Sequence, residues 1–518
     1  MSSLTIRPEI TAFAAEVSRP PVPVPEEELI HVSSATRRIA FAYERFRNTL
    51  EPDEEEILRR GAIIRILERR MFEDRPPEVI ATTILQELIR GHYIEPCPAV
   101  LAVHIGTTLQ KIRQVYAALP KSQSVWFLHL GAVAIDHELF PPTRQEMLVH
   151  LMYHDVYRRT AWADTSVREA DRPTQIYLGC HRALYAAENS ELAYHYFIHQ
   201  HPVWLQPELS AGNLDELVKS IPPFHRQMEA ALSHPLRDRI TRLLRPAAMP
   251  YIVLRDLLQT EGEKPLQSAP ALAEGVREAY NRRVRKTRGR MNKRAWHSIL
   301  FLFLTKTVLA IFVEAPYEQL VLGKVHYGAL ATNITFHPLL LFILATAARV
   351  PGQKNKERIV EQVSKIITGE GELPTIAITT PRRYGAATWT AFALFYALLF
   401  MGIFWTMFSV LDRLHFSLLA MFFFVVFLGL VSFLATRIRR SVDYLRVIPK
   451  GETAASAFIS FLALPVLEFG RALAQNIRQI NVLLFFMDRV LEAPFKLLID
   501  VTEEWFEFVR DRREEIVK

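Results

Sequence analysis

The stretch SILFLFLTKTVLAIFVEAPYEQLVL, residues 298–322, decides the fold of this 518-residue chain. Three further apolar segments follow it, at 327–350, 386–411 and 416–436. A bilayer core about 30 Å thick needs roughly 20 apolar helical residues to cross it. In lipid, each backbone amide must be paired within its own segment, which favours helices. The sequence therefore predicts an integral membrane protein with a four-helix transmembrane bundle in its second half.

The lysine and arginine residues between these segments indicate how the spans are oriented. Nine basic residues precede the first span in the run 277–294, whereas Lys324 is the single one between spans one and two. The connection between spans two and three is basic again, and the turn between spans three and four has only Arg413. Because basic residues stay on the cytoplasmic side of a membrane, we expect both termini in the cytoplasm.

The chain before the spans reads as a helical cytoplasmic domain. In EEEILRRGAIIRILERRMFED, residues 54–74, isoleucine and leucine recur among charges at helical spacing, and similar segments follow as far as residue 259. The pieces 125–135 and 375–380 are ambiguous between helix and strand, and few strands are expected. The fold class is all-α, in five parts: a disordered proline-rich tail (1–25), a helical cytoplasmic domain (26–260), a linker and basic juxtamembrane helix (261–297), the four-span domain (298–436) and a cytoplasmic amphipathic helical tail (437–518).

Residues 454–467 form a further apolar segment, of 14 residues, before Glu468 and Arg471. This length is short for a span and favours a re-entrant or interfacial helix. A fifth span is the alternative, and it would place the C-terminus outside.

Polar residues inside the spans are the first candidates for a functional site, because an intramembrane charge costs at least ~2.5 kcal/mol. Lys306 lies in span one, and Asn333 and His337 lie near the middle of span two. We interpret them as a polar pocket or ion path, or else as hydrogen bonds that fix the bundle. Glu314 lies about 80° around the helix from Lys306 and ~12 Å along it, so the two cannot pair directly. We place it at the outer interface.

Histidines in the first half offer a possible metal site. Glu146, His150 and His154 are spaced four residues apart, and imidazoles at this spacing can share a metal ion. A partly exposed polar helix face is the alternative reading. The run HYFIHQH, with His195, His199 and His201, is a weaker candidate. No nucleotide-binding or hydrolase motif occurs, so we expect no cofactor and lean against an enzyme.

The basic run before the first span can hold that segment inside the cell during insertion and can also attract anionic lipids. It lacks the interleaved aromatic residues of a nucleic-acid surface, so no nucleic acid is expected. The lipid-binding candidates are Arg282, Arg283, Arg285, Lys286, Arg288, Arg290, Lys293 and Arg294.

Three stretches together resemble an uncharacterised family of bacterial polytopic membrane proteins with a helical N-terminal domain. They are LTKTVLAIFVEAPYEQLVLG (304–323), FLATRIRRS (433–441) and the segment 480–517. The resemblance implies a place in the bacterial inner membrane. It supplies no catalytic residues.

The sequence leaves three functions open. The first is a non-enzymatic membrane-anchored scaffold, or envelope-organising protein, that recruits a protein partner or assembles with copies of itself. The second is a channel or transporter that uses Lys306, Asn333 and His337. The third, weaker one is a membrane-bound metalloenzyme built on Glu146, His150 and His154.

Overall fold

The protein divides into two compact units. The computed structural model describes residues 5–20, 25–30, 32, 55–162, 167–347, 350–379, 385–448, 454–479, 501 and 505. The span unit comprises Met1–Ser18, Arg158–Ser166 and Arg242–Ile480, and the helical unit comprises Arg19–Tyr157, Val167–Thr241 and Asn481–Lys518. Within the described residues nearly every element is a helix, which confirms the all-α fold class.

The helical unit is a bundle of short helices joined by tight connections. The segment 125–135, ambiguous in sequence, lies inside a helix. The elements are η1 (Glu26–Glu28), α3 (Glu55–Arg70), α4 (Pro77–Arg90), α5 (Val100–Ala118), α6 (Lys121–Leu139), α7 (Thr143–Arg159), η2 (Glu169–Asp171), α8 (Arg172–Tyr185), α9 (Asn189–Gln200), η3 (Pro202–Leu205), α10 (Ala211–Leu232) and the start of α11 (Arg237–Glu261).

The helical unit has its own apolar core. Ile63, Ile84 and Leu109 are fully buried, and Phe127 and Phe197 pack edge to face at 6.2 Å between ring centroids. Each such side chain contributes roughly 1.5–3 kcal/mol when it is withdrawn from water. Charged groups near the core are paired, for example Arg59 with Asp136 at 2.5 Å, because an unpaired buried charge would destabilise the fold.

The span unit combines long apolar helices with shorter polar elements. Its two strands form a parallel pair in which Thr160 lies opposite Ile376. The elements are α1 (Pro8–Ser18), β1 (Thr160–Trp162), the rest of α11, η4 (Lys264–Gln267), α12 (Ala269–Leu309), η5 (Ala310–Glu314), α13 (Ala315–Tyr317), η6 (Glu318–Leu322), α14 (Tyr327–Thr346), α15 (Gln353–Thr368), β2 (Ile376–Ile378), α16 (Ala386–Arg413), α17 (Leu418–Asp443) and α18 (Ala454–Gln479).

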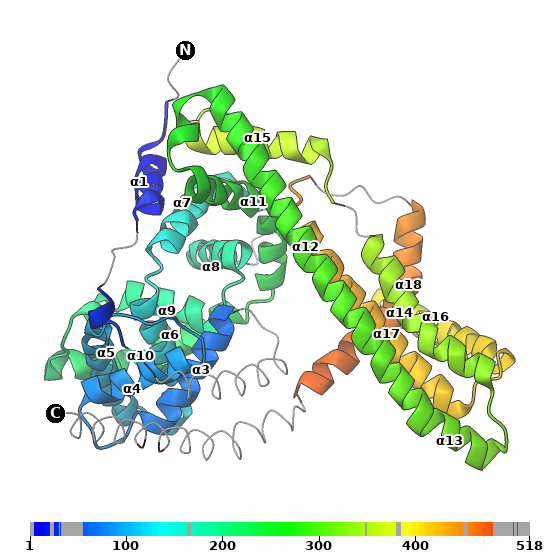
Figure 1. Ribbon diagram of the computed structural model, residues 1–518. Helices are drawn as coiled ribbons and strands as arrows, with labels where there is room; N and C mark the ends of the chain where they lie inside the picture. The colour runs from blue at the N-terminus through cyan, green and yellow to red at the C-terminus, as the bar shows by residue number, and fades with distance from the viewer. Residues whose placement is uncertain are drawn as a thin grey trace, which may run out of the picture. The chain divides into compact units, whose positions relative to one another are not determined.

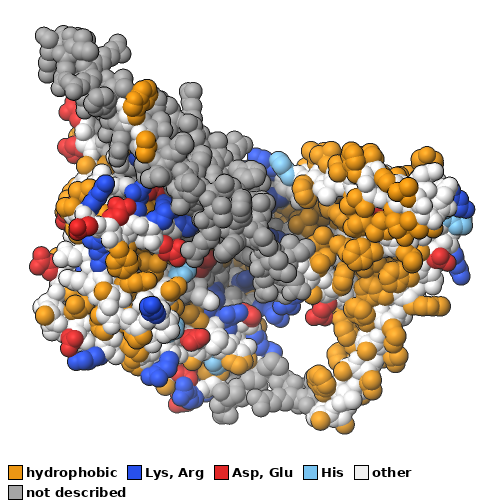
Figure 2. Space-filling view, turned by 90° about the horizontal axis from the view of Figure 1, so that it is seen from below, with side chains coloured by type: hydrophobic (Ala, Val, Ile, Leu, Met, Phe, Trp, Pro, Cys, Tyr) orange, Lys and Arg blue, Asp and Glu red, His pale blue; other side chains and the backbone are white. Residues whose placement is uncertain are grey.

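Four helical segments of the described chain are long and apolar enough to cross a membrane: Ala269–Leu322, Tyr327–Thr346, Ala386–Arg413 and Leu418–Arg439. Each overlaps one predicted span. Large apolar side chains on them face outward, among them Phe312 at 73% exposed and Trp405 at 72%. Figure 2 shows the resulting apolar surface. Soluble proteins rarely expose apolar patches of this extent, whereas a bilayer covers them.

The basic run and the first part of the first span belong to one continuous helix, α12, which is 41 residues long and is labelled in Figure 1. It leads into η5 and η6, which are π-helical turns on either side of Pro316. Proline lacks the N–H group that an α-helix needs at this position, and its ring collides with the preceding turn. Wider π turns accommodate such an interruption and change the direction in which the following side chains point.

Two segment boundaries differ from the prediction. Residues 8–18, expected within a disordered tail, form α1, because Ile10, Phe13 and Val17 give it an apolar face that is buried. Arg7 ties the start of this helix to α15 by donating its backbone N–H to Ile367 O at 3.0 Å. The second boundary is the predicted domain end at residue 260, since the chain from Arg242 onward belongs to the span unit.

The apolar segment 454–467 is part of α18, which is 26 residues long and packs on α17. The two helices cross at Gly429 and Gly470, where a Cβ atom on Gly470 would collide with the Gly429 backbone. Small residues allow such close approach between helices in a membrane. Tyr396 on α16 also donates to Glu468 on α18 at 2.9 Å. Most of the predicted tail beyond residue 479 lies outside the described residues.

Candidate functional site

A chain of buried hydrogen bonds joins the first two spans. Lys306 Nζ donates to Asn333 Oδ1 at 2.7 Å, and Asn333 Nδ2 donates to the two carboxylate oxygens of Glu314 at 3.0 and 2.8 Å. All three side chains are completely buried. We call Lys306, Asn333 and Glu314 the polar network. It joins a cation and an anion through one neutral amide.

Glu314 joins the polar network from the end of the first span. It is the last residue of the π-helical turn η5, and its carboxylate faces α14. Burial within the protein does not fix depth in a membrane, so the outer-interface position of Glu314 stays a prediction. Lys306 and Glu314 are connected through Asn333, and the structure therefore brings together two of the three predicted intramembrane residues and adds Glu314.

His337, the third predicted residue, links α14 to α17 instead of joining the polar network. Its Nε2 atom lies 3.0 Å from the backbone oxygen of Phe424, and its Nδ1 atom lies 3.3 Å from the oxygen of Asn333. The imidazole packs against the Phe424 ring at 4.7 Å between centroids. It thus holds the backbone of Asn333 in place one helical turn away.

The polar network has different neighbouring residues on its two sides. On the side of the 323–326 loop, Glu318 is 1% exposed and accepts a hydrogen bond from the His326 backbone N–H at 2.8 Å, and the His326 ring stacks on His415. Toward the basic run, Lys306 is followed by an apolar layer. That layer contains Met291, Ala295, Leu302, Leu341, Ala345, Val431, Ala435, Ile438 and Val442. Polar groups therefore continue from the network toward the loop, where they lie beside a second apolar cluster. That cluster contains Ala329, Leu411, Phe416, Ala420, Met421 and Phe424.

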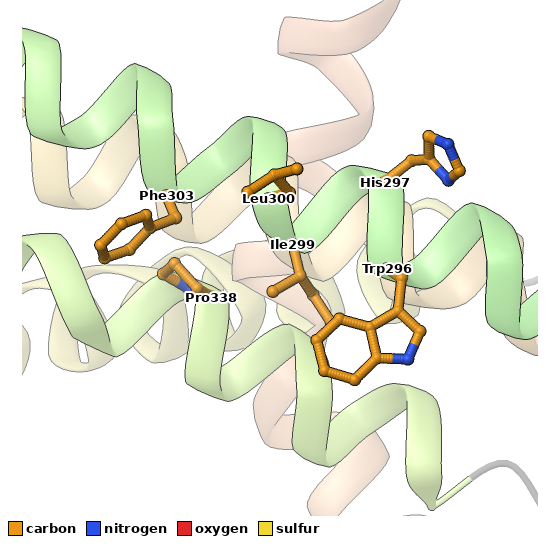
Figure 3. A pocket seen from close by; sticks show the side chains of 6 residues that line it. All are labelled: Trp296, His297, Ile299, Leu300, Phe303 and Pro338. Carbon is orange, nitrogen blue, oxygen red and sulfur yellow. The ribbon is translucent and has the colours of Figure 1, made fainter.

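An apolar groove lies between α12 and α14, at the junction of the basic run and the first span. It has a volume of about 350 Å³ and is lined by Trp296, His297, Ile299, Leu300, Phe303 and Pro338. In Figure 3, Trp296 and Ile299 point toward α14, on which Pro338 lies, and His297 points away. The Trp296 side chain is 62% exposed.

The basic candidates before this groove fall into two groups. Arg282 pairs with Glu261 at 2.7 Å, and Arg283 pairs with Asp256 at 2.5 Å, so these two connect α12 to α11. The other six candidates are at least partly exposed, and they are Arg285, Lys286, Arg288, Arg290, Lys293 and Arg294.

A histidine–glutamate cluster lies inside the helical unit. Glu146 comes from α7, His181 from α8 and His195 from α9. Glu146 Oε1 lies 2.9 Å from His195 Nδ1 and 3.6 Å from His181 Nε2, and the three atoms lie within 4.8 Å of one another. The two imidazole rings stack at 4.8 Å between centroids. Two imidazoles and a carboxylate at these distances are a possible metal-ligand set.

The electrostatic surroundings leave these groups in states that can bind a metal. Burial raises the pKa of Glu146, but the close contact and charge of His195, helped by His181, outweigh it and lower the pKa to about 2. Burial lowers the pKa of His181 to about 3, although the Glu146 charge opposes this. At neutral pH the carboxylate is therefore ionised and the His181 imidazole is neutral, as coordination requires.

The predicted metal-site residues are only partly brought together. His150 approaches Glu146 Oε2 at 3.7 Å, but its side chain is 65% exposed, and His154 is exposed. Each step of four residues turns about 40° around the helix axis, so His150 lies at the edge of the face on which Glu146 meets α8 and α9, and His154 lies beyond it. His199 is exposed as well. His195, a weaker candidate in the sequence, belongs to the cluster.

His181 was not singled out from the sequence, since it is an isolated histidine on α8 with no metal-binding spacing around it. A neighbouring histidine, His137 on α6, lies with its ring 5.0 Å from that of His195. Tyr177 donates to Glu146 Oε2 at 3.2 Å and so orients the carboxylate.

No protein family, curated protein or solved structure matches this chain. The resemblance to bacterial polytopic membrane proteins therefore stays a prediction, and function has to be argued from the residues themselves.

Proposed function

We propose that this is a multi-pass inner-membrane protein whose polar network takes part in the movement of protons or small cations. The observation that carries the proposal is the complete burial of Lys306 and Glu314 in helices with the length and composition of membrane spans. Ionisable residues at such positions are costly and commonly mark ion pathways or proton relays.

The connection through Asn333 supports exchange of a proton in this network. The amide donates to Glu314 with its nitrogen and accepts from Lys306 with its oxygen. Protonation of Glu314 would remove the charge that the amide nitrogen stabilises, and loss of a proton from Lys306 would compensate for it. The pair can therefore be doubly charged or doubly neutral with no change in net charge.

The polar groups around the network suggest the side from which ions enter. Glu318 and His326 continue these groups toward the 323–326 loop, which the distribution of basic residues predicts to be the outer side. Apolar layers lie on both sides of the network, around Ala329 and Met421 toward this loop and around Leu302 and Leu341 toward the basic run. Transport would then require these layers to open in turn, which is a conformational change typical of transporters.

The test is ion flux in proteoliposomes, with protons, Na⁺ and K⁺ as the probes. The wild-type protein would be compared with Lys306→Leu and Glu314→Gln, and Lys354→Leu, at an exposed position on α15, is the matched control. We expect flux in the wild type and control and none in the two network variants. Absence of flux of all three ions in the wild type, or flux that survives both network variants, would overturn the proposal.

A membrane-anchored scaffold is a second proposed function. What favours it is the exposure of three apolar side chains on α4 and α5 of the helical unit, since Val79, Val100 and Val103 are 45, 58 and 52% exposed. Such side chains can contact a protein partner or a second copy. After gentle solubilisation, the Val100→Asp, Val103→Asp double variant should lose its partner or its oligomeric state, and Val125→Asp on α6 should keep it. A monomeric, unpartnered wild type would contradict this role.

We also propose that anionic phospholipid occupies the groove at the start of the first span. The exposed Arg290, Lys293 and Arg294 precede the groove, and Trp296 has the position of an interfacial tryptophan. Native mass spectrometry after reconstitution in phosphatidylglycerol should show retained lipid in the wild type. Arg290→Gln with Lys293→Gln and Arg294→Gln should lose it, whereas replacement of the paired Arg282 should have less effect. Equal retention of phosphatidylcholine would contradict the proposal.

A further inference from the structure

The geometry of the helical unit points to a second site, unrelated to the polar network, and we propose that Glu146, His181 and His195 bind one divalent transition-metal ion. Their three ligand atoms are Oε1, Nε2 and Nδ1, and they converge from three separate helices. This set differs from the Glu146, His150 and His154 grouping expected from the sequence.

The strongest support is that each of the three atoms is buried and makes no well-formed hydrogen bond within the described part of the chain, although Glu146 Oε1 lies 2.9 Å from His195 Nδ1. His181 is 2% exposed and His195 is 3% exposed. Buried polar atoms are nearly always satisfied, and an unsatisfied one costs about 1–3 kcal/mol. Three such atoms that face one another are explained together by a single cation between them.

The distances fit a metal ion. Zinc lies ~2.0–2.2 Å from imidazole nitrogen and carboxylate oxygen, so tetrahedral ligand atoms lie roughly 3.4 Å apart. The observed separations of Glu146 Oε1 from His195 Nδ1, 2.9 Å, and from His181 Nε2, 3.6 Å, lie on either side of this value.

The ligand chemistry limits which ion can bind. Imidazole suits zinc, iron, cobalt and nickel, whereas magnesium and calcium prefer oxygen ligands alone. Three protein ligands leave at least one coordination position for water, which is the arrangement of catalytic rather than structural zinc sites. The Glu146 side chain is 23% exposed, so water and small molecules can reach this side of the site.

Neighbouring side chains are placed to orient the ligands. Tyr177 donates to Glu146 Oε2, the carboxylate oxygen that is not among the three proposed ligand atoms, at 3.2 Å. The His137 ring packs against His195 at 5.0 Å. Partners of this kind commonly change metal affinity by about 10–100-fold when they are removed. Tyr177→Phe should therefore weaken metal binding by that factor without removing a ligand.

The experiment is stoichiometric binding of Zn²⁺ and Co²⁺, each added alone, to the full chain after chelator treatment in detergent. We expect about one ion per chain, and absorption spectra of the cobalt form that report four or five ligands. Glu146→Gln, His181→Gln and His195→Gln should lose the ion, whereas His154→Gln and His199→Gln, at exposed positions on α7 and α9, should retain it.

A variant that gains an absorption band distinguishes loss of a ligand from loss of metal through misfolding. In His195→Cys the Sγ atom lies near the position from which Nδ1 approaches Glu146, so the variant should bind Co²⁺ and acquire a thiolate-to-cobalt charge-transfer band. Absence of stoichiometric binding by the wild type would overturn the proposal, as would binding that the three ligand variants leave unchanged. A buried water molecule would then satisfy the three atoms.

Discussion

Lys306 on α12 donates a 2.7 Å hydrogen bond to Asn333 on α14, and the same amide donates to Glu314. Lys306 and Glu314 thus depend on one neutral residue. Asn333→Leu would remove the hydrogen-bond partner of both buried charges and leave Lys306 with only the ring of Phe427, 4.5 Å away, among the described residues. Loss of one member of a buried pair costs about 3–5 kcal/mol. We expect a loss of that order in the free energy of unfolding, measured in mixed micelles.

A double-variant cycle separates this effect from simple loss of packing. Replacing both charges, as Lys306→Met with Glu314→Leu, should destabilise the protein much less than the sum of the two single variants, because neither charge is left alone. Thr332→Val is the matched control on α14, since Thr332 is exposed and its hydroxyl donates to Gly328 of its own helix. Additive effects of the two charge variants would show that the residues are not coupled.

The elements that the sequence predicted well are those in which apolar residues either recur at helical spacing or fill a long segment without interruption. The spans follow from apolar length alone, and α3 and α4 follow from the spacing of isoleucine and leucine around Ile63 and Ile84. Proline near residues 76 and 77 and Gly91 mark the ends of α4. These features depend only on residues that are close together in the chain, so they can be read from one sequence.

The sites were predicted less completely, because their residues meet only through tertiary packing. Glu314 turns toward Asn333 at a π-helical turn, and ideal α-helical geometry cannot anticipate that change of direction. His181 and His195 approach Glu146 from two other helices, and neither shows a metal-binding spacing with it. Spacing along one helix pointed to His150 and His154, whose side chains are exposed instead of buried with Glu146.

The crossing of α17 and α18 predicts that a glycine-to-alanine substitution lowers stability there and does not lower it at a glycine elsewhere. Gly470→Ala would push a methyl group into the Gly429 backbone, so the helices must separate, at a cost of about 1–3 kcal/mol. A methyl group on Gly402 of α16 would meet no atom within 4 Å, so Gly402→Ala should be neutral or stabilise by up to ~1 kcal/mol. Thermal unfolding in detergent measures both. Equal midpoints would contradict the crossing.

The distribution of basic residues gives a prediction about the two loops. In a Cys97→Ala, Cys180→Ala background, single cysteines can replace the exposed Lys324 and Lys354. A membrane-impermeant maleimide should label Lys324→Cys in intact spheroplasts and Lys354→Cys only after permeabilisation. Labelling of both in intact spheroplasts would contradict the four-span topology, and the reverse pattern would invert it.

Lys111 predicts how the stability of the helical unit depends on pH. It is 7% exposed, and its Nζ donates to the backbone oxygens of Trp204 at 2.8 Å and Gln206 at 3.0 Å. Burial lowers the pKa of Lys111 below its usual 10.5. Between the lowered pKa and 10.5 the unfolded chain binds more protons than the folded one, so stability from this group rises with pH.

The comparison is between wild type and Lys111→Met from neutral pH to about pH 10. The wild type should gain stability relative to the variant as the pH rises, because its buried ammonium becomes neutral while methionine does not titrate. Lys121→Met, at an exposed position on α6, should change little with pH relative to wild type. The unfolding midpoint of the helical unit, followed by circular dichroism, measures the difference. The prediction is contradicted if the stability of the wild type relative to Lys111→Met falls as the pH rises. The two carbonyl contacts would then stabilise the charged ammonium by more than burial destabilises it.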